Sequence, residues 1–235
     1  MSKAATSPLI LFSGLAADAN IFVHQKTEFP ELIVPEWPIP TSDESLEEYA
    51  ARLAGQLRSR NPCVIGGASF GGIVAQHVAH HLQPLAVVLI GSVRAPSELP
   101  IYARMARPMR FLVPIIPVRL LQCLIRPLTT RFARNLTPHL SGLAKQFCTC
   151  HPQVFKWSLL RILDWRSVPT FACPVFHVHG DRDYVLPSKR TQPDRLIHGG
   201  GHVISLTHPA EVNESIRDVL NQLSDASVTH AVDES

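Results

Sequence analysis

Short apolar runs alternate along this sequence with segments of helical periodicity, and this alternation narrows the choice of fold more than any other feature. The runs are too short, and end too abruptly, to be helices, so we interpret them as buried strands. They are residues 7–13, 62–68, 86–90 and 175–178, with weaker candidates at 32–34 and 196–197. Buried strands that alternate with helices predict an α/β fold with a parallel sheet covered on both faces.

Three segments have the spacing of helices that cover such a sheet. Apolar residues recur every three or four positions over residues 41–58, where Thr41 and Glu44 have the spacing of a capping box. Residues 71–81 follow an apolar run almost without a loop. Residues 209–223 begin with a proline, which the first turn of a helix tolerates.

The length of the chain suits a single domain. Its 235 residues, 46% of them hydrophobic, can bury one full core. We expect a core of residues 7–93 and 170–223, with a helical cap inserted at about 94–169. The tail at 224–235 has few apolar residues, and we expect it to be disordered.

The expected cap holds the excess positive charge of the chain. Before Asp164 its basic residues are opposed only by Glu98. These basic residues are Arg94, Arg104, Arg107, Arg110, Arg119, Arg126, Arg131, Arg134, Lys145, Lys156 and Arg161.

Composition excludes several classes of protein. A charged content of 17% argues against a disordered chain, and a net charge of +3 is too small to indicate nucleic-acid binding. Residues 1–8 lack the features of a secretory signal, and no run approaches the roughly 20 apolar residues of a membrane span, so we expect a cytoplasmic protein. The five cysteines are irregularly spaced, and Cys148-Thr149-Cys150-His151 has no second ligand pair at zinc-site spacing. We therefore expect reduced thiols and no metal or cofactor.

A G-x-S-x-G sequence, Gly67-Ala68-Ser69-Phe70-Gly71, lies where an expected strand meets an expected helix. A serine in such a sharp turn has strained backbone angles, and the small residues around it let neighbouring backbone pass. The helix also directs its N-terminal amides toward the place where negative charge develops during acyl transfer. Ser69 is thus a candidate nucleophile with Gly67 and Gly71 as elbow glycines. A glycine-rich turn with a solvated serine is the alternative interpretation.

An acid and a histidine follow two of the later strands. Asp183 ends the sequence His179-Gly180-Asp181-Arg182-Asp183, and His202 follows Gly201. Loops that follow parallel strands meet at one edge of the sheet, so both side chains are expected near Ser69. The chain order serine, acid, histidine fits this architecture.

Other acids and histidines compete for these roles. Asp181 is an alternative acid, and His198 is an alternative base. We expect His77, His80 and His81 to be solvated or to cap the helix after Ser69.

Together these motifs resemble those of the α/β-hydrolase superfamily over residues 7–223. The matches are residues 67–71 to the nucleophile elbow, 179–183 to the H-G-x-x-D acid loop and 201–202 to the histidine loop. The resemblance implies that Ser69 is the nucleophile, Asp183 the acid and His202 the base. It also implies an α/β-hydrolase fold with a mostly parallel sheet of about six strands, because the chain begins at what would be the family's third strand.

The resemblance extends to the loop after the first strand. Many family members have His-Gly there, followed by a residue whose amide helps to bind the oxyanion. This chain has Ser13-Gly14-Leu15, so Ser13 departs from the pattern. By this match the backbone amides of Leu15 and Phe70 would be the oxyanion donors.

The expected function is a serine hydrolase that cleaves a carboxylic ester or thioester through an acyl-enzyme on Ser69, without a cofactor. The basic, apolar cap suggests an acyl pocket with a cationic rim, suited to a small anionic or carrier-linked substrate. Two other interpretations are that the arginines only solvate the cap or that the cap contacts an anionic lipid surface. A silent binding protein of the same fold and an acyltransferase are the alternative functions.

Overall fold

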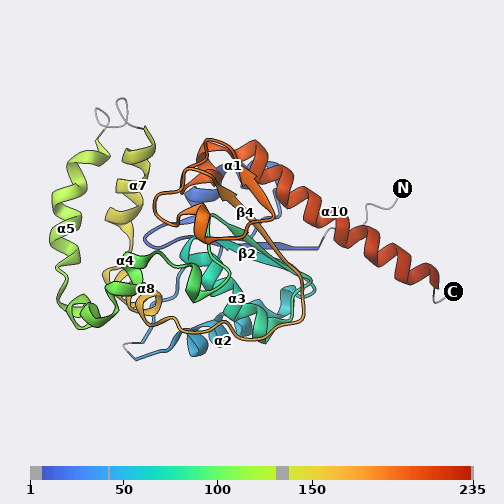
Figure 1. Cartoon of the computed structure of the whole chain (residues 1–235), viewed down its shortest axis with the longest axis horizontal. Helices are drawn as coiled ribbons and strands as arrows, with labels where there is room; N and C mark the ends of the chain where they lie inside the picture. The colour runs from blue at the N-terminus through green and yellow to red at the C-terminus, as the bar shows by residue number, and fades with distance from the viewer. Residues whose placement is uncertain (1–6, 42, 131–137, 234–235) are drawn as a thin grey trace.

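The computed structural model describes residues 7–41, 43–130 and 138–233 (Figure 1). One parallel sheet of five strands, in the order β1-β2-β3-β4-β5, forms its centre. The strands are β1 (Leu9–Phe12), β2 (Val64–Ala68), β3 (Ala86–Ile90), β4 (Val175–Gly180) and β5 (Arg195–Ile197). Phe12 and Leu89 both lie beside Gly67, so the carboxyl ends of three strands meet at one edge.

The sheet has five strands where about six were expected, because residues 32–34 form only an isolated bridge. Ile33 pairs with Ile10 beside β1, through one backbone hydrogen bond to Leu9 and one from Leu11, both 2.9 Å. Prolines follow at positions 35, 38 and 40. A proline has no amide to donate to a ladder, so the pairing cannot extend.

Successive strand residues pack against two separate layers of helices. On one face Ile10, Phe12 and Ile65 pack with α2 (Leu46–Leu57) and α3 (Phe70–Leu82). On the other face Leu9, Leu11 and Val64 pack with the remaining core helices. Those helices are η1 (Ala19–Phe22), α9 (Ile204–Thr207) and α10 (Pro209–Asp233), and α1 (Val23–Glu28) contacts all three of them. The sheet is therefore buried between two helical layers, as the alternation of apolar runs predicts.

Two helices differ from their expected bounds. The helix expected at 41–58 begins at Leu46, and its capping box is formed by Ser45 and Glu48. Glu44 accepts the amide of Thr41 but is paired with Arg52 at 2.8 Å, so it caps a turn that precedes the helix. The tail was expected to be disordered, whereas α10 continues to Asp233 and projects beyond the body of the protein (Figure 1).

A group of helices between β3 and β4 forms the cap. They are η3 (Pro96–Glu98), α4 (Ile101–Met105), η4 (Arg107–Ile115), α5 (Val118–Ile125), η5 (Arg126–Thr129), α7 (Pro138–Thr149) and α8 (Pro152–Asp164). Two of the basic residues assigned to the cap, Arg131 and Arg134, lie outside the described residues. The other short helices within the described residues are η2 (Arg58–Arg60) and η6 (Ser188–Arg190).

Helix α8 connects the cap to the core. Trp157 is buried and donates its indole N–H to the Glu44 carbonyl at 2.6 Å. Helix α5 lies on the far side of the cap from the sheet (Figure 1). Among the described helices, none is by itself long and apolar enough to cross a bilayer; only the pair 107–115 and 118–129, bent by 78°, meets that test by length and composition.

Candidate active site

Ser69 lies in a strained turn between β2 and α3. Its backbone angles are φ 51° and ψ −120°, a conformation that L-residues rarely adopt. A Cβ at Gly71 would lie 2.2 Å from the Phe12 carbonyl oxygen, and one at Gly67 would lie 2.4 Å from the Gly71 backbone. Both positions therefore require glycine because other backbone segments pass so close to them. This tight turn places the Ser69 side chain at the carboxyl edge of the sheet.

Three loops far apart in sequence bring Ser69, His202 and Asp183 into one hydrogen-bonded chain. His202 Nε2 lies 3.0 Å from Ser69 Oγ, and His202 Nδ1 lies 2.7 Å from Asp183 Oδ2. With Nδ1–H donating to the carboxylate, Nε2 is free to accept the serine proton. The arrangement has the contacts and the order of a nucleophile, a base and an orienting acid.

The Asp183 carboxylate is buried and surrounded by donors. Its Oδ1 accepts the backbone amides of Val185 and Leu186, both at 2.8 Å. Burial alone would raise the pKa of Asp183, but hydrogen bonds from His179, His202 and Leu186 together hold this pKa well below its ordinary value. The carboxyl group is therefore ionised and can stabilise a positive charge on His202.

A second pair of histidines lies behind Asp183. His179 Nε2 lies 2.7 Å from the Leu186 carbonyl, to which it donates, and 3.3 Å from Asp183 Oδ2. Its Nδ1 lies 3.1 Å from His177 Nε2. Burial, with the neighbouring His179 and Arg94, lowers the pKa of His177 to about 3. His177 is therefore neutral and donates to His179, which fixes the His179 ring against the acid loop.

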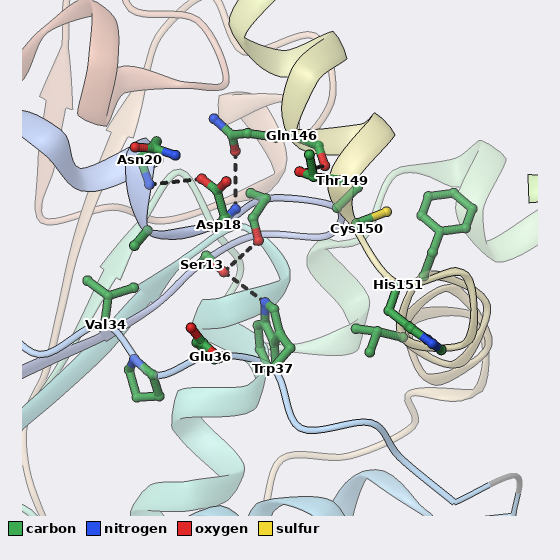
Figure 2. A pocket seen from close by; sticks show the side chains of 16 residues that line it. Ser13, Asp18, Asn20, Val34, Glu36, Trp37, Gln146, Thr149, Cys150 and His151 are labelled. Atoms are coloured by element: carbon green, nitrogen blue, oxygen red, sulfur yellow. Dashed lines mark hydrogen bonds between the residues drawn. The ribbon is translucent and has the colours of Figure 1, made fainter. Parts of the chain in front are cut away.

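The loop after β1 is held by Ser13. Its hydroxyl donates to the Ala17 carbonyl at 2.9 Å and accepts the Trp37 indole N–H at 2.7 Å (Figure 2). The same loop is fixed to the cap, because the Asp18 amide donates to Gln146 of α7 at 3.3 Å. Ser13 and Gln146 thus both contribute contacts that hold this loop.

Leu15 and Phe70, the two residues assigned to the oxyanion hole, lie beside Ser69. Both line the same cavity as Ser69, and a Cβ at Gly14 would lie 3.5 Å from the Ser69 Cβ. In the parts of the chain that the structure describes, no residue accepts a hydrogen bond from either backbone amide. Two amides without partners next to a nucleophile are suited to bind an oxyanion.

The cavity at Ser69 is apolar and measures about 310 Å³. The cap contributes much of its lining: Ala103 of α4, Ala106 directly after that helix, and Leu159 and Leu163 of α8. No lysine or arginine is among the described residues that line it.

A separate cavity of about 390 Å³ lies against the loop after β1 (Figure 2). It is bounded by that loop, by residues 34–37 and by the facing ends of α7 and α8. The two cavities share no lining residue: Leu15 lines the Ser69 cavity, whereas Ser13, Ala16 and Ala17 line the second one.

A model of the alpha/beta hydrolase family matches residues 11–215, which is most of the chain. The chain belongs to the alpha/beta hydrolase family. No curated protein sequence matches this alpha/beta hydrolase significantly.

Solved structures with the same fold cover nearly the whole chain. A thermophilic esterase from Thermogutta terrifontis is 19% identical, with 92% of this chain and 90% of that chain covered and a TM-score of 0.70. A carboxylesterase structure from Nitrososphaera gargenis is 17% identical, with 96% and 94% covered and a TM-score of 0.71. The RedJ thioesterase from Streptomyces coelicolor is 18% identical, with 90% and 86% covered and a TM-score of 0.59.

The alternative acid and base of this alpha/beta hydrolase pair with each other. His198 Nδ1 lies 2.8 Å from Asp181 Oδ2, and Asp181 Oδ1 accepts the Gly199 amide at 2.7 Å. The His198 side chain is 91% exposed. Within the described residues, neither Asp181 nor His198 is hydrogen-bonded to Ser69. The geometry therefore favours Asp183 as the acid and His202 as the base.

Sequence reasoning missed several residues that surround the site of this hydrolase. Tyr102 of α4 lines the Ser69 cavity and donates to the Val185 carbonyl, which joins the cap to the acid loop. His77 was expected at the surface of α3, but it is buried. It accepts the Trp165 indole N–H at 3.0 Å and lies 3.1 Å from Glu47. Burial, partly opposed by Glu47, lowers the pKa of His77.

Potential metal ligands of this hydrolase cluster away from Ser69. Among the described residues, Glu47, His80 and His81 can bring one ligand atom each within 4.8 Å of one another. Glu47 already pairs with His81 at 2.7 Å, and His80 lies 2.7 Å from the Thr170 carbonyl. Contacts between α2, α3 and the segment before β4 account for these side chains.

Proposed function

We propose that this alpha/beta hydrolase cleaves carboxylic esters or thioesters through an acyl-enzyme on Ser69. The observation that carries the proposal is the hydrogen-bonded chain from Ser69 through His202 to Asp183 beside an apolar cavity. A serine supports acyl transfer, because the oxygen of its hydroxyl can bond to a carbonyl carbon. The apolar lining favours a substrate whose acyl group is also apolar.

In the first half of the reaction, Ser69 Oγ bonds to the carbonyl carbon while its proton passes to His202 Nε2. The carbonyl oxygen becomes an oxyanion, which the amides of Leu15 and Phe70 stabilise. His202 then gives its proton to the departing alcohol or thiol, and the acyl group remains on Ser69. Asp183 stabilises the imidazolium throughout.

In the second half, water takes the place of the leaving group. His202 accepts a proton from the water as its oxygen bonds to the acyl carbon. The bond to Ser69 Oγ then breaks and the proton returns to the serine. Esters and thioesters come before amides because their leaving groups need less protonation than an amine.

The proposal is tested with p-nitrophenyl and coenzyme A esters of graded acyl length. We expect Ala106→Phe, which fills part of the cavity at Ser69, to lower kcat/KM for octanoyl esters by about tenfold or more while acetyl esters are little affected. The matched control is Ala51→Phe on the exposed surface of α2, which should change neither value. No hydrolysis of any ester by the wild type would overturn the proposed activity. Equal losses for acetyl and octanoyl esters in Ala106→Phe would contradict the assignment of the cavity.

A further inference from the structure

The charge of the cap is separated from that of the rest of the chain. Residues 99–163 contain 10 of the 22 lysines and arginines and none of the 19 aspartates and glutamates. The remainder of the chain is therefore net negative. Such a concentration of one sign on an inserted segment indicates a surface that attracts anions.

The same segment exposes large apolar side chains. Met105, Phe111, Ile115 and Leu124 are 71%, 70%, 72% and 67% exposed, values that leave most of each side chain in water. Together with Met109 and Leu120, which are also more than half exposed, they define what we call the outer cap face. These residues belong to the consecutive helices α4, η4 and α5.

Helix α5 is amphipathic in a way that core packing does not explain. Leu120 and Leu124 are one turn apart and both exposed, whereas Val118 is buried. Figure 1 shows α5 at the outer side of the cap, away from the sheet. Leu120 and Leu124 are exposed on this outer helix, and an interaction outside the chain explains their exposure better than folding does.

A basic groove lies beside this face, between α5 and α7. It measures about 520 Å³, and its lining includes Arg119, Arg126 and Lys145 but no acidic residue. Within the described ranges, none of these three cations has an ion-pair partner. Three unpaired cations next to exposed apolar side chains complement the phosphate and the acyl chains of an anionic lipid.

A bilayer accounts for this combination better than a second copy of the chain does. A symmetric dimer through the outer cap face would bring the basic segment of one copy against that of the other. A lipid interface instead supplies anionic headgroups for the cations. It also accepts apolar side chains from helices that are bent by 78°, without requiring a complementary shape.

We propose that the outer cap face docks onto anionic lipid bilayers. The apolar side chains enter the boundary between headgroups and acyl chains, and the cations of the basic groove bind headgroup phosphates. Helix α4 carries Met105 on this face and Ala103 in the lining of the Ser69 cavity, so one short helix separates the bilayer from that cavity. Docking itself does not depend on the proposed catalysis.

The test is co-sedimentation of the full chain with vesicles, using the Ser69→Ala protein so that catalysis has no influence on the result. One set of vesicles is phosphatidylcholine, and the other is equal parts phosphatidylcholine and phosphatidylglycerol. We expect binding to the anionic vesicles at low salt, with loss of binding at high salt. Phe111→Ser with Leu124→Ser should weaken binding by about tenfold or more. Arg119→Ala with Lys145→Ala should weaken it by about twentyfold.

Matched controls are Leu196→Ser, an exposed apolar residue of β5, and Arg58→Ala with Arg60→Ala on η2. These variants should bind as the parent protein does. Failure to bind anionic vesicles would overturn the proposal and favour an acidic protein as the occupant. Unchanged binding by Phe111→Ser with Leu124→Ser would also overturn it, since charge alone would then account for binding and the apolar side chains would not enter the bilayer. A stable dimer by light scattering that the same substitutions dissociate would show that a second copy occupies the face.

Discussion

Replacing Ser69 with alanine is expected to lower ester turnover by about a millionfold, which is the usual cost of removing a nucleophile that acts as a unit with its base. His202 would still be held by Asp183 at 2.7 Å, but no oxygen would be positioned to form the acyl-enzyme. The measurement is kcat for p-nitrophenyl butanoate with purified protein. Circular dichroism should show an unchanged fold, because the substitution removes only the serine hydroxyl.

The matched control for Ser69→Ala is Ser188→Ala. Ser188 follows the acid loop and its hydroxyl donates to the Asp181 carbonyl, but it does not line the Ser69 cavity. Turnover should stay within a few-fold of the wild-type value. A Ser69→Ala protein that keeps a tenth of wild-type turnover would contradict the role assigned to Ser69.

The second large effect is expected from Asp183→Asn, which should lower kcat by about ten-thousandfold while leaving the fold intact. The asparagine oxygen can still accept the amides of Val185 and Leu186. Its NH₂ group would instead donate to His202 Nδ1, so that the proton moves to Nε2 and the imidazole can no longer accept one from Ser69. Turnover of the same ester measures the loss.

Asp181→Asn is the matched control for this experiment. Asp181 is two residues away and pairs with the exposed His198, so we expect its replacement to change kcat by less than tenfold. A larger loss from Asp181→Asn than from Asp183→Asn would show that the acid has been assigned to the wrong residue.

The pKa of Asp183 also determines how pH acts through this residue. Because the folded state holds this pKa below its ordinary value, ionised Asp183 stabilises the fold at neutral pH. This contribution is present above about pH 4, the pKa of an unfolded aspartate, and is lost as the pH falls through the lower folded value. Protonation of Asp183 therefore does not reduce activity between about pH 4 and pH 7.

Much of the fold could be predicted from periodicity because strands β1, β2 and β3 are buried on both faces. Residues 64–68 and 86–90 have no polar side chains and are bounded by turns, so the sequence alone indicates two buried strands there. The first residue of the helix after Ser45 is harder to predict, since Thr41 and Glu44 have the same capping-box spacing as Ser45 and Glu48. Only the tertiary pairing of Glu44 with Arg52 distinguishes the two.

Residues of the candidate site could be predicted from the sequence only where they lie in recognisable loop motifs. Ser69, Asp183 and His202 each follow a strand in a motif, and they meet as that topology predicts. His177 and His179 had a weaker signal: they are two residues apart on a strand, and therefore on one face of the sheet.

Contacts made across the fold left no sequence signal. The hydrogen bond from Trp37 to Ser13 and that from Tyr102 to Val185 depend on how distant segments pack. The burial of His77 likewise depends on Trp165, which comes from the end of the cap.

The central claim is that Ser69 is activated by His202 and Asp183, and labelling with a fluorophosphonate probe tests it most directly. We predict one covalent adduct on the wild-type protein, located on Ser69 by peptide mass spectrometry. The adduct should be absent from Ser69→Ala and form far more slowly on Asp183→Asn. A folded wild-type protein that forms no adduct, or forms one only at another residue, would contradict the claim.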